Sequence, residues 1–253
     1  MKDIIVGMGE ALWDCLPEGR KFGGAPANFA YHVGQFGWHS VVVSAVGQDP
    51  LGDEIMEIVN NVKLDNKIAR VAYPTGTVQV TLSGDGIPAY EVCENVAWDN
   101  IPWTDELGEI ARRTKAVCFG SLAQRSPVSR ATILKLNEEE IEVVSALLHL
   151  DGSAEERCHK IIDRYPSLKM VILTCGAIGS NVFTATETSY QDTPKVKVAD
   201  TVGAGDSFTA TFVAQYLKGK PVKEAHRIAV QASAFVCTQN GAMPVFPDEI
   251  LNA

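Results

Sequence analysis

The sequence predicts an α/β protein with a doubly wound, largely parallel sheet. Short apolar segments rich in β-branched residues recur along the 253 residues without internal alternation, as is typical of strands buried on both faces. Segments with helical periodicity lie between them, and this alternation favours a layered fold with helices on both sides of the sheet. We expect strands at residues 3–9, 40–47, 116–123 and 170–176, and helices at residues 26–37, 50–62 and 153–165.

One segment departs from this pattern. Residues 75–92 alternate apolar side chains, among them Val78 and Val80, with polar ones, and an SGDG turn interrupts the alternation. This predicts a hairpin with one face in solvent. A hairpin inserted between parallel units commonly covers a site at the carboxyl edge of the strands, so we interpret it as a lid. The alternative is an antiparallel strand pair at the edge of the main sheet.

The last third of the chain contains two further helical patterns, at residues 206–219 and 222–241. The second pattern ends at Gly241, a residue suited to a helix C-cap. The sequence shows no internal repeat and no linker. We therefore expect a single domain over residues 1–253, with a lid formed by about residues 10–24 and 72–97.

Composition and charge exclude several classes of protein. The net charge is −9 and no block is rich in Lys or Arg, whereas nucleic-acid binding normally needs a clustered basic surface. No apolar span reaches about 18 residues, and the start of the chain is too acidic for a signal peptide. The six cysteines lack metal-ligand spacing, which indicates small buried side chains in a reducing compartment. We expect a cytoplasmic protein with no nucleic-acid or membrane partner.

The segment DTVGAGDSF, residues 200–208, has the composition of a phosphoryl-transfer site. Gly203 and Gly205 lack a Cβ, so their backbone N–H groups can converge on an anion at the positive end of the helix that follows. Asp206 comes directly after them, and a carboxylate beside a phosphate can accept a proton from an attacking hydroxyl. The alternative for this motif alone is an ordinary tight turn with Asp206 as the N-cap.

A second Gly-rich segment, GGAPANFA at residues 23–30, leads into the first helix. Gly23 and Gly24 permit close approach of the backbone to a small ligand, and Asn28 offers both a donor and an acceptor for sugar hydroxyls. Asp14 follows the first strand and can also accept hydrogen bonds from hydroxyls. The alternative is a helix N-terminus beside a surface turn.

Two further segments place polar residues after predicted strands. LKLNEEE, residues 134–140, presents Asn137 for phosphate oxygens and Glu140 for magnesium-bound water. The alternative is an acidic helix start with Asn137 as its cap, a role compatible with the first. LTCG, residues 173–176, presents Thr174 and Gly176 where nucleotide phosphates can lie. No GxxxxGK[ST] motif occurs and no GxGxxG follows the first strand, which disfavours P-loop enzymes and dinucleotide oxidoreductases.

In this order, GGAPANFA, the hairpin, LKLNEEE, LTCG, DTVGAGDSF and the late CTQNGAM resemble the ribokinase-like (pfkB) carbohydrate kinases, and most closely the bacterial fructokinases. The resemblance spans nearly the whole chain. It implies a ribokinase-like three-layer α/β/α fold with a small β-hairpin lid. The implied activity is that of an ATP-dependent sugar kinase, with fructose as the expected substrate. A sibling kinase for ribose, 2-keto-3-deoxygluconate or a nucleoside is an alternative, and so is a non-catalytic sugar-binding relative.

The resemblance also implies roles for single residues. It makes Asp206 the catalytic base and makes Gly203, Ala204 and Gly205 the anion hole for the γ-phosphate. It places the sugar on Asp14, Gly24 and Asn28, with Gly23 beside them. Nucleotide contacts would come from Asn137, Thr174, Gly176 and Asn240. Glu140 would hold Mg²⁺ through water, and Asp200 and Val202 would hold a monovalent cation such as K⁺.

Tyr90, near the end of the hairpin, fits two roles equally well. It can close over the sugar, or it can stabilise a contact between two lids. The resemblance implies a homodimer through the lid.

The resemblance breaks at the junction between Ile133 and Leu134. There the family carries a further helix, strand and helix, on the order of 30 residues, whereas here a helix-like segment runs directly into a strand-like one. A parallel crossover cannot be made across so short a junction. Either the chain has lost this unit or the printed sequence omits residues, and the second interpretation is favoured because a lost internal strand would open the core.

Overall fold

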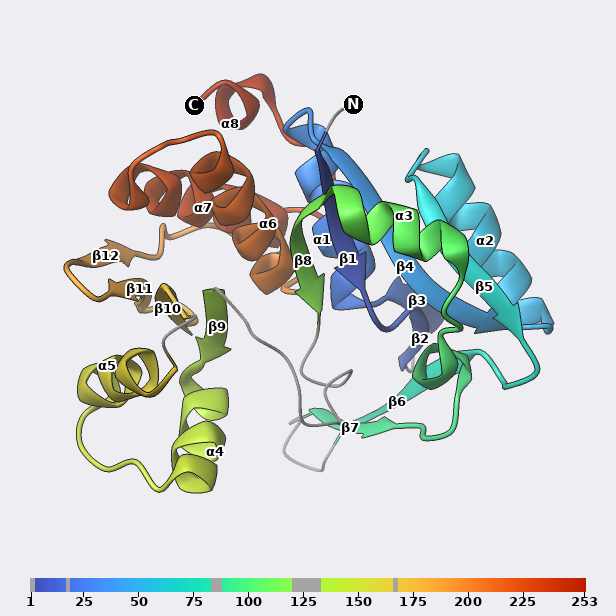
Figure 1. The fold of residues 1–253 in the computed structure, drawn as a ribbon, viewed down its shortest axis with the longest axis horizontal. Coiled ribbons are helices and arrows are strands. Elements are labelled where there is room, and N and C mark those ends of the chain that lie inside the picture. Colours follow the sequence, from blue (N-terminus) through green and yellow to red (C-terminus); the bar gives the residue numbers. More distant parts are fainter. Residues whose placement is uncertain (1–2, 17–18, 83–87, 120–132, 166–167) are drawn as a thin grey trace. The chain divides into compact units, whose positions relative to one another are not determined.

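The computed structural model describes residues 3–16, 19–82, 88–119, 133–165 and 168–253 (Figure 1). These residues belong to two compact units. The first unit contains residues 1–126 and 241–245, and the second contains residues 127–240 and 246–253.

The first unit is built around a four-stranded parallel sheet with the order β5-β4-β1-β8. Its strands are formed by the apolar segments that the sequence predicts to be buried. They are β1 (Ile4–Met8), β4 (His39–Gly47), β5 (Asn66–Val71) and β8 (Thr114–Phe119). The predicted strand at residues 116–123 therefore continues to Phe119, and its remaining residues lie outside the described ones.

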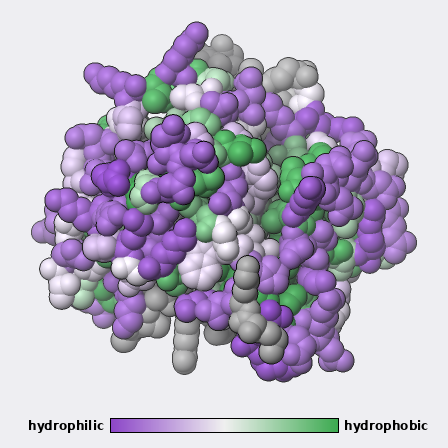
Figure 2. All heavy atoms as spheres, turned by 90° about the horizontal axis from the view of Figure 1, so that it is seen from above, coloured by the Kyte–Doolittle hydropathy of each residue, from purple (hydrophilic) through white to green (hydrophobic). Residues whose placement is uncertain are grey.

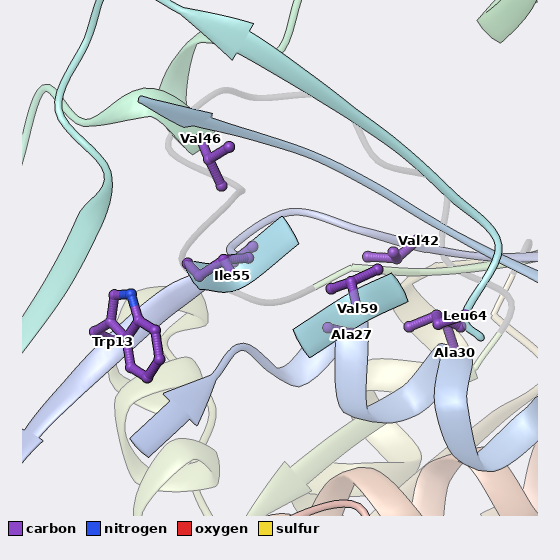
Figure 3. Packing of buried hydrophobic residues seen from close by; sticks show 9 residues of the cluster. Trp13, Ala27, Ala30, Val42, Val46, Ile55, Val59 and Leu64 are labelled. Atoms are coloured by element: carbon purple, nitrogen blue, oxygen red, sulfur yellow. The ribbon is translucent and has the colours of Figure 1, made fainter. Parts of the chain in front are cut away.

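Helices cover both faces of this sheet, as the sequence predicts. The helices are α1 (Ala25–Gln35), α2 (Pro50–Asn61) and α3 (Asp105–Arg113). Val42 and Val46 of β4 pack with residues of α1 and α2 (Figure 3), whereas Val41 and Val43 pack with Leu107 of α3. Alternate residues of one strand thus point to opposite layers, which is why its sequence is apolar throughout.

A second sheet of the first unit contains the predicted hairpin. Its order is β3-β2-β6-β7, with the strands β2 (Leu12–Leu16), β3 (Gly19–Gly23), β6 (Gly76–Leu82) and β7 (Pro88–Val92); a short 3-10 helix follows at Ala97–Asn100. The antiparallel pairing of β6 with β7 confirms the hairpin. The alternative of an edge pair on the main sheet is wrong, because β6 and β7 belong to this separate sheet. Its action as a lid stays a prediction.

The second unit has a mixed sheet with the order β12-β11-β10-β9. Its strands are β9 (Ile133–Asn137), β10 (Met170–Cys175), β11 (Gly179–Thr184) and β12 (Thr188–Asp192). The helices are α4 (Glu138–Leu148), α5 (Ala154–Arg164), α6 (Ala204–Leu217), α7 (Val222–Cys237) and α8 (Asp248–Leu251). Val171 and Leu173 pack with residues of α4 and α5, whereas Met170 and Ile172 pack with residues of α6 and α7, so this sheet too is covered on both faces.

The predicted end of the last long helix is wrong. The sequence pattern favours Gly241, but α7 ends at Cys237. The Cys237 carbonyl accepts hydrogen bonds from the backbone N–H groups of Ala199 (2.8 Å) and Asp200 (3.3 Å). The neighbouring loop therefore takes the place of a further helical turn.

The strands β8 and β9 each lie at one end of a four-stranded sheet. Among the described residues, β8 pairs with β1 alone and β9 pairs with β10 alone. The junction between Ile133 and Leu134, at which the resemblance implies an absent helix, strand and helix, lies within β9, so Ile133 belongs to the strand and not to the helix-like segment predicted before it.

The outer faces of the helices are mostly polar. Hydrophilic residues cover most of the face shown in Figure 2, and hydrophobic side chains form small patches among them. Within the described residues, no helix combines the length and the apolar character needed to cross a membrane.

Candidate active site

The Gly-rich turn before α6 has the geometry of an anion site. Gly203 is the N-cap of α6 and has φ = 79°, a left-handed conformation that favours glycine. Asp206 lies in the first turn of the helix and is half-buried. Among the described residues, no acceptor is found for the N–H of Gly205. A helix N-terminus with a donor directed outward attracts a negatively charged group.

Lys135 of β9 lies beside this turn and was not predicted as a site residue. A Cβ added at Gly205 would be 3.4 Å from Lys135 Nζ. Ile133 packs in the core below α6 and α7, and strand alternation puts Lys135 on the same face. The signal in the sequence is a lysine at the centre of an apolar strand, a position that needs an anionic neighbour or a polar ligand.

The predicted phosphate and magnesium motif forms a capping box at the start of α4. Asn137 Oδ1 accepts hydrogen bonds from the N–H groups of Glu139 (2.9 Å) and Glu140 (2.7 Å), and Glu140 Oε2 accepts one from Asn137 N–H (2.7 Å). The alternative of a capped helix start is thus what the structure shows. Glu140 Oε1 keeps its capacity to accept a further hydrogen bond. The described residues contain no cluster of three or more metal-ligating side chains.

Thr174 lies directly beside this cap. In the parallel register of β9 and β10, Thr174 is the partner of Asn137, and its Oγ1 donates to the Leu136 carbonyl at 3.4 Å. Gly176 follows at the turn after β10, and its carbonyl accepts a hydrogen bond from Thr193 Oγ1 (2.8 Å). The structure therefore brings Asn137 and Thr174 together at one edge of the sheet.

The loop at residues 199–202 carries the predicted monovalent-cation residues. Asp200 Oδ1 accepts a hydrogen bond from Val202 N–H (3.0 Å), and the loop is held to the last carbonyl of α7. The negative end of the α7 dipole and the Asp200 carboxylate both favour a cation there. Burial, together with the nearby Asp200 carboxylate, raises the pKa of the Cys237 thiol. Asn240 is exposed in the segment after α7.

The predicted sugar residues lie in the first unit, around the β2–β3 hairpin. Burial raises the pKa of Asp14, and the nearby Lys21, its cross-strand partner, opposes this effect. Gly23 leaves room for the carboxylate, because an added Cβ would overlap Asp14 Oδ2 unless that side chain moved. Gly24 has φ = 127°, and a Cβ there would overlap the Glu10 carbonyl. The two glycines therefore let the chain enter α1 directly beside a half-buried carboxylate.

Asn28 lies in the first turn of α1 and is almost fully buried. Pro26 occupies the start of the helix, and the N–H of Asn28 donates to the Gly24 carbonyl at 3.1 Å. Tyr90 lies in β7, in register with Val80 of β6. The side chain of Tyr90 is outside the described part of the structure, so its predicted contact with sugar stays a prediction.

The chain is similar in sequence to carbohydrate kinases. A model described as "pfkB family carbohydrate kinase" matches residues 118–249, which is more than half of the chain. A fructokinase from Solanum tuberosum is 28% identical, with 97% of this chain and 93% of the relative covered. An ATP-dependent 6-phosphofructokinase from Thermoanaerobacterium thermosaccharolyticum is 27% identical, with coverages of 93% and 85%.

A solved structure shares the fold over the full chain. A fructokinase with bound ATP from Xylella fastidiosa matches with a TM-score of 0.78 at 22% identity, covering 100% of this chain and 98% of the other. The fold is therefore the ribokinase-like α/β fold that the resemblance implies.

Proposed function

Because the chain belongs to the pfkB family of carbohydrate kinases and is a sugar kinase, we propose that it transfers the γ-phosphoryl group of ATP to a primary hydroxyl of D-fructose. The observation that carries this proposal is the pair formed by an open N–H donor at Gly205 and a carboxylate, Asp206, within one helical turn. The fructokinases from potato and other plants support the choice of sugar. Their identities, 26–28%, leave the substrate as a proposal.

In the proposed mechanism, Asp206 orients the attacking hydroxyl and accepts its proton. In a loose transition state the hydroxyl keeps its proton until the new bond is well advanced, so a carboxylate is a sufficient base. The anion hole proposed for Gly203, Ala204 and Gly205 would stabilise the negative charge on the γ-phosphate, with the Gly205 N–H open to the phosphate and the Ala204 N–H donating to the Thr201 carbonyl (3.3 Å). Lys135 would add a positive charge on the same side, since its ammonium lies next to Gly205.

The residues at the start of α4 fit a magnesium site. Magnesium prefers oxygen ligands and keeps several of its waters, and Glu140 Oε1 is available to bind one of these waters. When bound, Mg²⁺ would neutralise charge on the β- and γ-phosphates. Asn137 and Thr174 would contact phosphate oxygens, with Gly176 and Asn240 on the nucleotide side.

The monovalent-cation site is proposed for the loop that precedes the anion hole. The side chain of Asp200 and the carbonyl of Val202 would hold K⁺ near the C-terminus of α7. This cation would fix the loop on which the Gly203–Gly205 turn depends.

The remaining expectations concern the sugar side. Asp14 and Asn28 would bind sugar hydroxyls, and closure of the sheet that contains β6 and β7 would exclude water that otherwise hydrolyses ATP. Tyr90 would act either on the sugar or in a homodimer formed through this sheet.

The six cysteines are all unpaired, which supports a reducing compartment such as the cytoplasm.

The test of the catalytic role is Asp206→Asn. We expect turnover with fructose and ATP to fall by at least about a thousandfold, because the hydroxyl loses its base. Fructose binding, measured by calorimetry, should change little. Asp163→Asn removes an exposed carboxylate of α5 in the same unit and is the matched control, expected to retain full activity. Near-normal turnover of the Asp206→Asn variant would contradict the role of Asp206 as the catalytic base.

The substrate is tested by an ADP-coupled screen of fructose, ribose, 2-keto-3-deoxygluconate and a nucleoside. Fructose 6-phosphate belongs in the screen because one relative is named a 6-phosphofructokinase. We expect the highest kcat/KM for fructose. A clear preference for another acceptor would contradict the fructose assignment and leave the kinase activity intact.

A further inference from the structure

A surface cavity of about 370 Å³, open to solvent at the exposed side chains of Lys63 and Asp65, lies in the first unit where α1, β4 and the turn after α2 meet. This volume is within the usual range for small-molecule sites. Its polar and aromatic walls are formed by Tyr31, Gln35, Trp38, His39, Lys63 and Asp65.

The cavity is distinct from the proposed sugar site. It lies at the amino ends of β4 and β5, since His39 begins β4 and Asp65 precedes β5. The proposed sugar residues follow the carboxyl end of β1, and Asn28 is in the first turn of α1. Gln35 is the last residue of α1, so the two sites lie at opposite ends of this helix.

The inner wall of the cavity is held rigidly. Leu64 lines the cavity and also packs in the buried core, where Figure 3 shows it close to Ala30 of α1. The Gln35 amide nitrogen donates to the Pro244 carbonyl (3.1 Å) and to His32 Nδ1 (3.1 Å). His32 Nε2 carries the proton, because it lies 2.8 Å from a carbonyl oxygen. A wall fixed in advance lowers the entropic cost of binding a ligand.

The cavity offers one cation and several hydroxyl-binding groups. Within the described residues, the Lys63 ammonium has no ion-pair partner and the Tyr31 hydroxyl has no hydrogen bond. His39 Nε2 and Asp65 Oδ2 are hydrogen-bonded at 2.8 Å, which fixes both side chains in the wall of the cavity. Trp38 adds an aromatic surface on which a sugar ring can lie.

Lys63 occupies a strained position. It follows α2 with φ = 54°, its N–H bonds to the Asn60 carbonyl, and the N–H of Leu64 bonds to the Val59 carbonyl. This is a Schellman C-cap, in which glycine is the usual residue because it carries no Cβ penalty. The chain has instead a charged residue at a position where glycine would give a more stable fold.

We propose that this cavity binds a small phosphorylated sugar. Lys63 would neutralise the phosphate, and Tyr31 with the His39–Asp65 pair would bind the hydroxyls, while the ring lies against Trp38. The proposal rests on the proposed function only for the choice of probe, since a fructose phosphate is the product of that reaction.

The test is calorimetric binding of fructose 1-phosphate and fructose 6-phosphate, with inorganic phosphate and fructose as comparison probes. All variants are made in an Asp14→Ala background, which removes the proposed sugar site. We expect one sugar phosphate per chain to bind at least tenfold more tightly than inorganic phosphate. Lys63→Gly should weaken this binding at least tenfold and raise the melting temperature, because strain and charge disappear together.

Two further variants separate these effects. Lys63→Gln keeps the strained backbone and should lose binding without a gain in stability. His149→Gly relieves a left-handed residue at the end of α4, φ = 55°, in the second unit, so it should raise the melting temperature and leave binding within twofold.

Unchanged binding in Lys63→Gly, or equal affinity for inorganic phosphate, would overturn the proposal. Failure of the proposed function would be seen separately, as absence of turnover with fructose in the wild type.

Discussion

The carboxylate of Asp14 keeps its place beside the main chain because residue 23 has no side chain. Neighbouring residues in β2 and β3 are thus coupled sterically as well as by hydrogen bonds. In the sequence, Gly23 and Asp14 are nine positions apart, and the GGAPAN motif suggested only that glycine permits a close approach. The structure shows that the group lying against Gly23 is the carboxylate of Asp14.

Gly23→Ala tests this coupling. The added methyl would displace the Asp14 carboxylate, so we expect the KM for fructose to rise at least about tenfold, a cost of roughly 1.4 kcal/mol or more. The KM for ATP should stay within about twofold. Gly108→Ala, in α3, adds a methyl with only an ordinary contact to Trp103 and should leave both constants unchanged. An equal rise in both KM values would indicate general damage to the protein instead.

The buried His226 makes stability depend on pH. Its two ring nitrogens contact Ser180 Oγ (2.8 Å) and Ser189 Oγ (2.9 Å), and burial lowers its pKa to about 4. Between pH 4 and about 6.5, His226 is neutral in the folded protein but largely protonated in the unfolded chain, so the folded state binds fewer protons. The contribution of His226 to the free energy of unfolding is therefore complete above pH 6.5, and up to about 3 kcal/mol of it is lost as the pH falls.

The measurement is the free energy of unfolding in urea between pH 8 and pH 4.5. His226→Leu should be less stable at pH 8, because two buried serines lose their partner, yet its stability should fall less steeply with acid. His149→Gln changes an exposed histidine and should keep the wild-type slope. An unchanged slope in His226→Leu would show that this histidine is not the titrating group. His32 remains in both variants, and burial lowers its pKa to about 4 as well.

At the scale of single elements, the turn between β4 and α2 is held by one carboxylate. Asp49 is the N-cap of α2 and accepts hydrogen bonds from Gly52 N–H (2.8 Å), Thr75 N–H (2.8 Å) and Thr75 Oγ1 (2.6 Å). Burial alone would raise the pKa of Asp49, but these bonds lower it. Thr75 directly precedes β6. The hydrogen bonds between Asp49 and Thr75 therefore join the main sheet to the sheet that contains the hairpin.

Asp49→Ala should reduce the free energy of unfolding by about 2 kcal/mol, since a cap and two further, partly buried hydrogen bonds are lost together. Asp53→Ala, in the first turn of the same helix, removes an exposed ion pair with Arg70 and should cost no more than about 1 kcal/mol. Urea titration at pH 7 gives both values. Similar losses in the two variants would contradict the role of Asp49 as the anchor of this turn.

Element boundaries show which structures a sequence can predict. The strands β1, β4 and β10 and the helices α1, α2 and α5 follow from local periodicity, and the structure has them within two residues of the expected positions. The end of α7 depends on Ala199 and Asp200, which are about 40 residues away, and no local pattern records that contact. Lys135 was missed for a similar reason, because its neighbour Gly205 is 70 residues further along the chain.

At the scale of the whole molecule, the chain is shorter than its relatives within the aligned region. The alignment with the potato fructokinase runs over 298 positions, 45 more than the chain has residues. Among the described residues, β8 ends at Phe119 and β9 begins at Ile133, so the junction between Ile133 and Leu134 at which the resemblance implies a further unit lies within β9. The sequence predicted this break from one abrupt change of pattern, whereas the division into two compact units needed the structure.

The two units should respond to different ligands. The proposed sugar residues Asp14, Gly24 and Asn28 all belong to the first unit, whereas Asp206, Asn137 and Thr174 belong to the second. Each unit has its own buried core, so a ligand that binds one of them stabilises local structure there. At a hundred times its Kd, a ligand adds about 2.7 kcal/mol to the state that it binds.

Amide hydrogen exchange with each ligand alone measures this response. We expect fructose to slow exchange in β2, β3 and α1, and ADP with Mg²⁺ to slow it in β9, β10 and the first turns of α4 and α6. Asp14→Ala should abolish the first effect and keep the second, which makes it the control for the assignment. Protection of β2, β3 and α1 by ADP, or of β9, β10 and α4 by fructose, would contradict the division of roles, whereas the first turn of α6 is expected to respond to both ligands because Asp206 would contact the fructose hydroxyl.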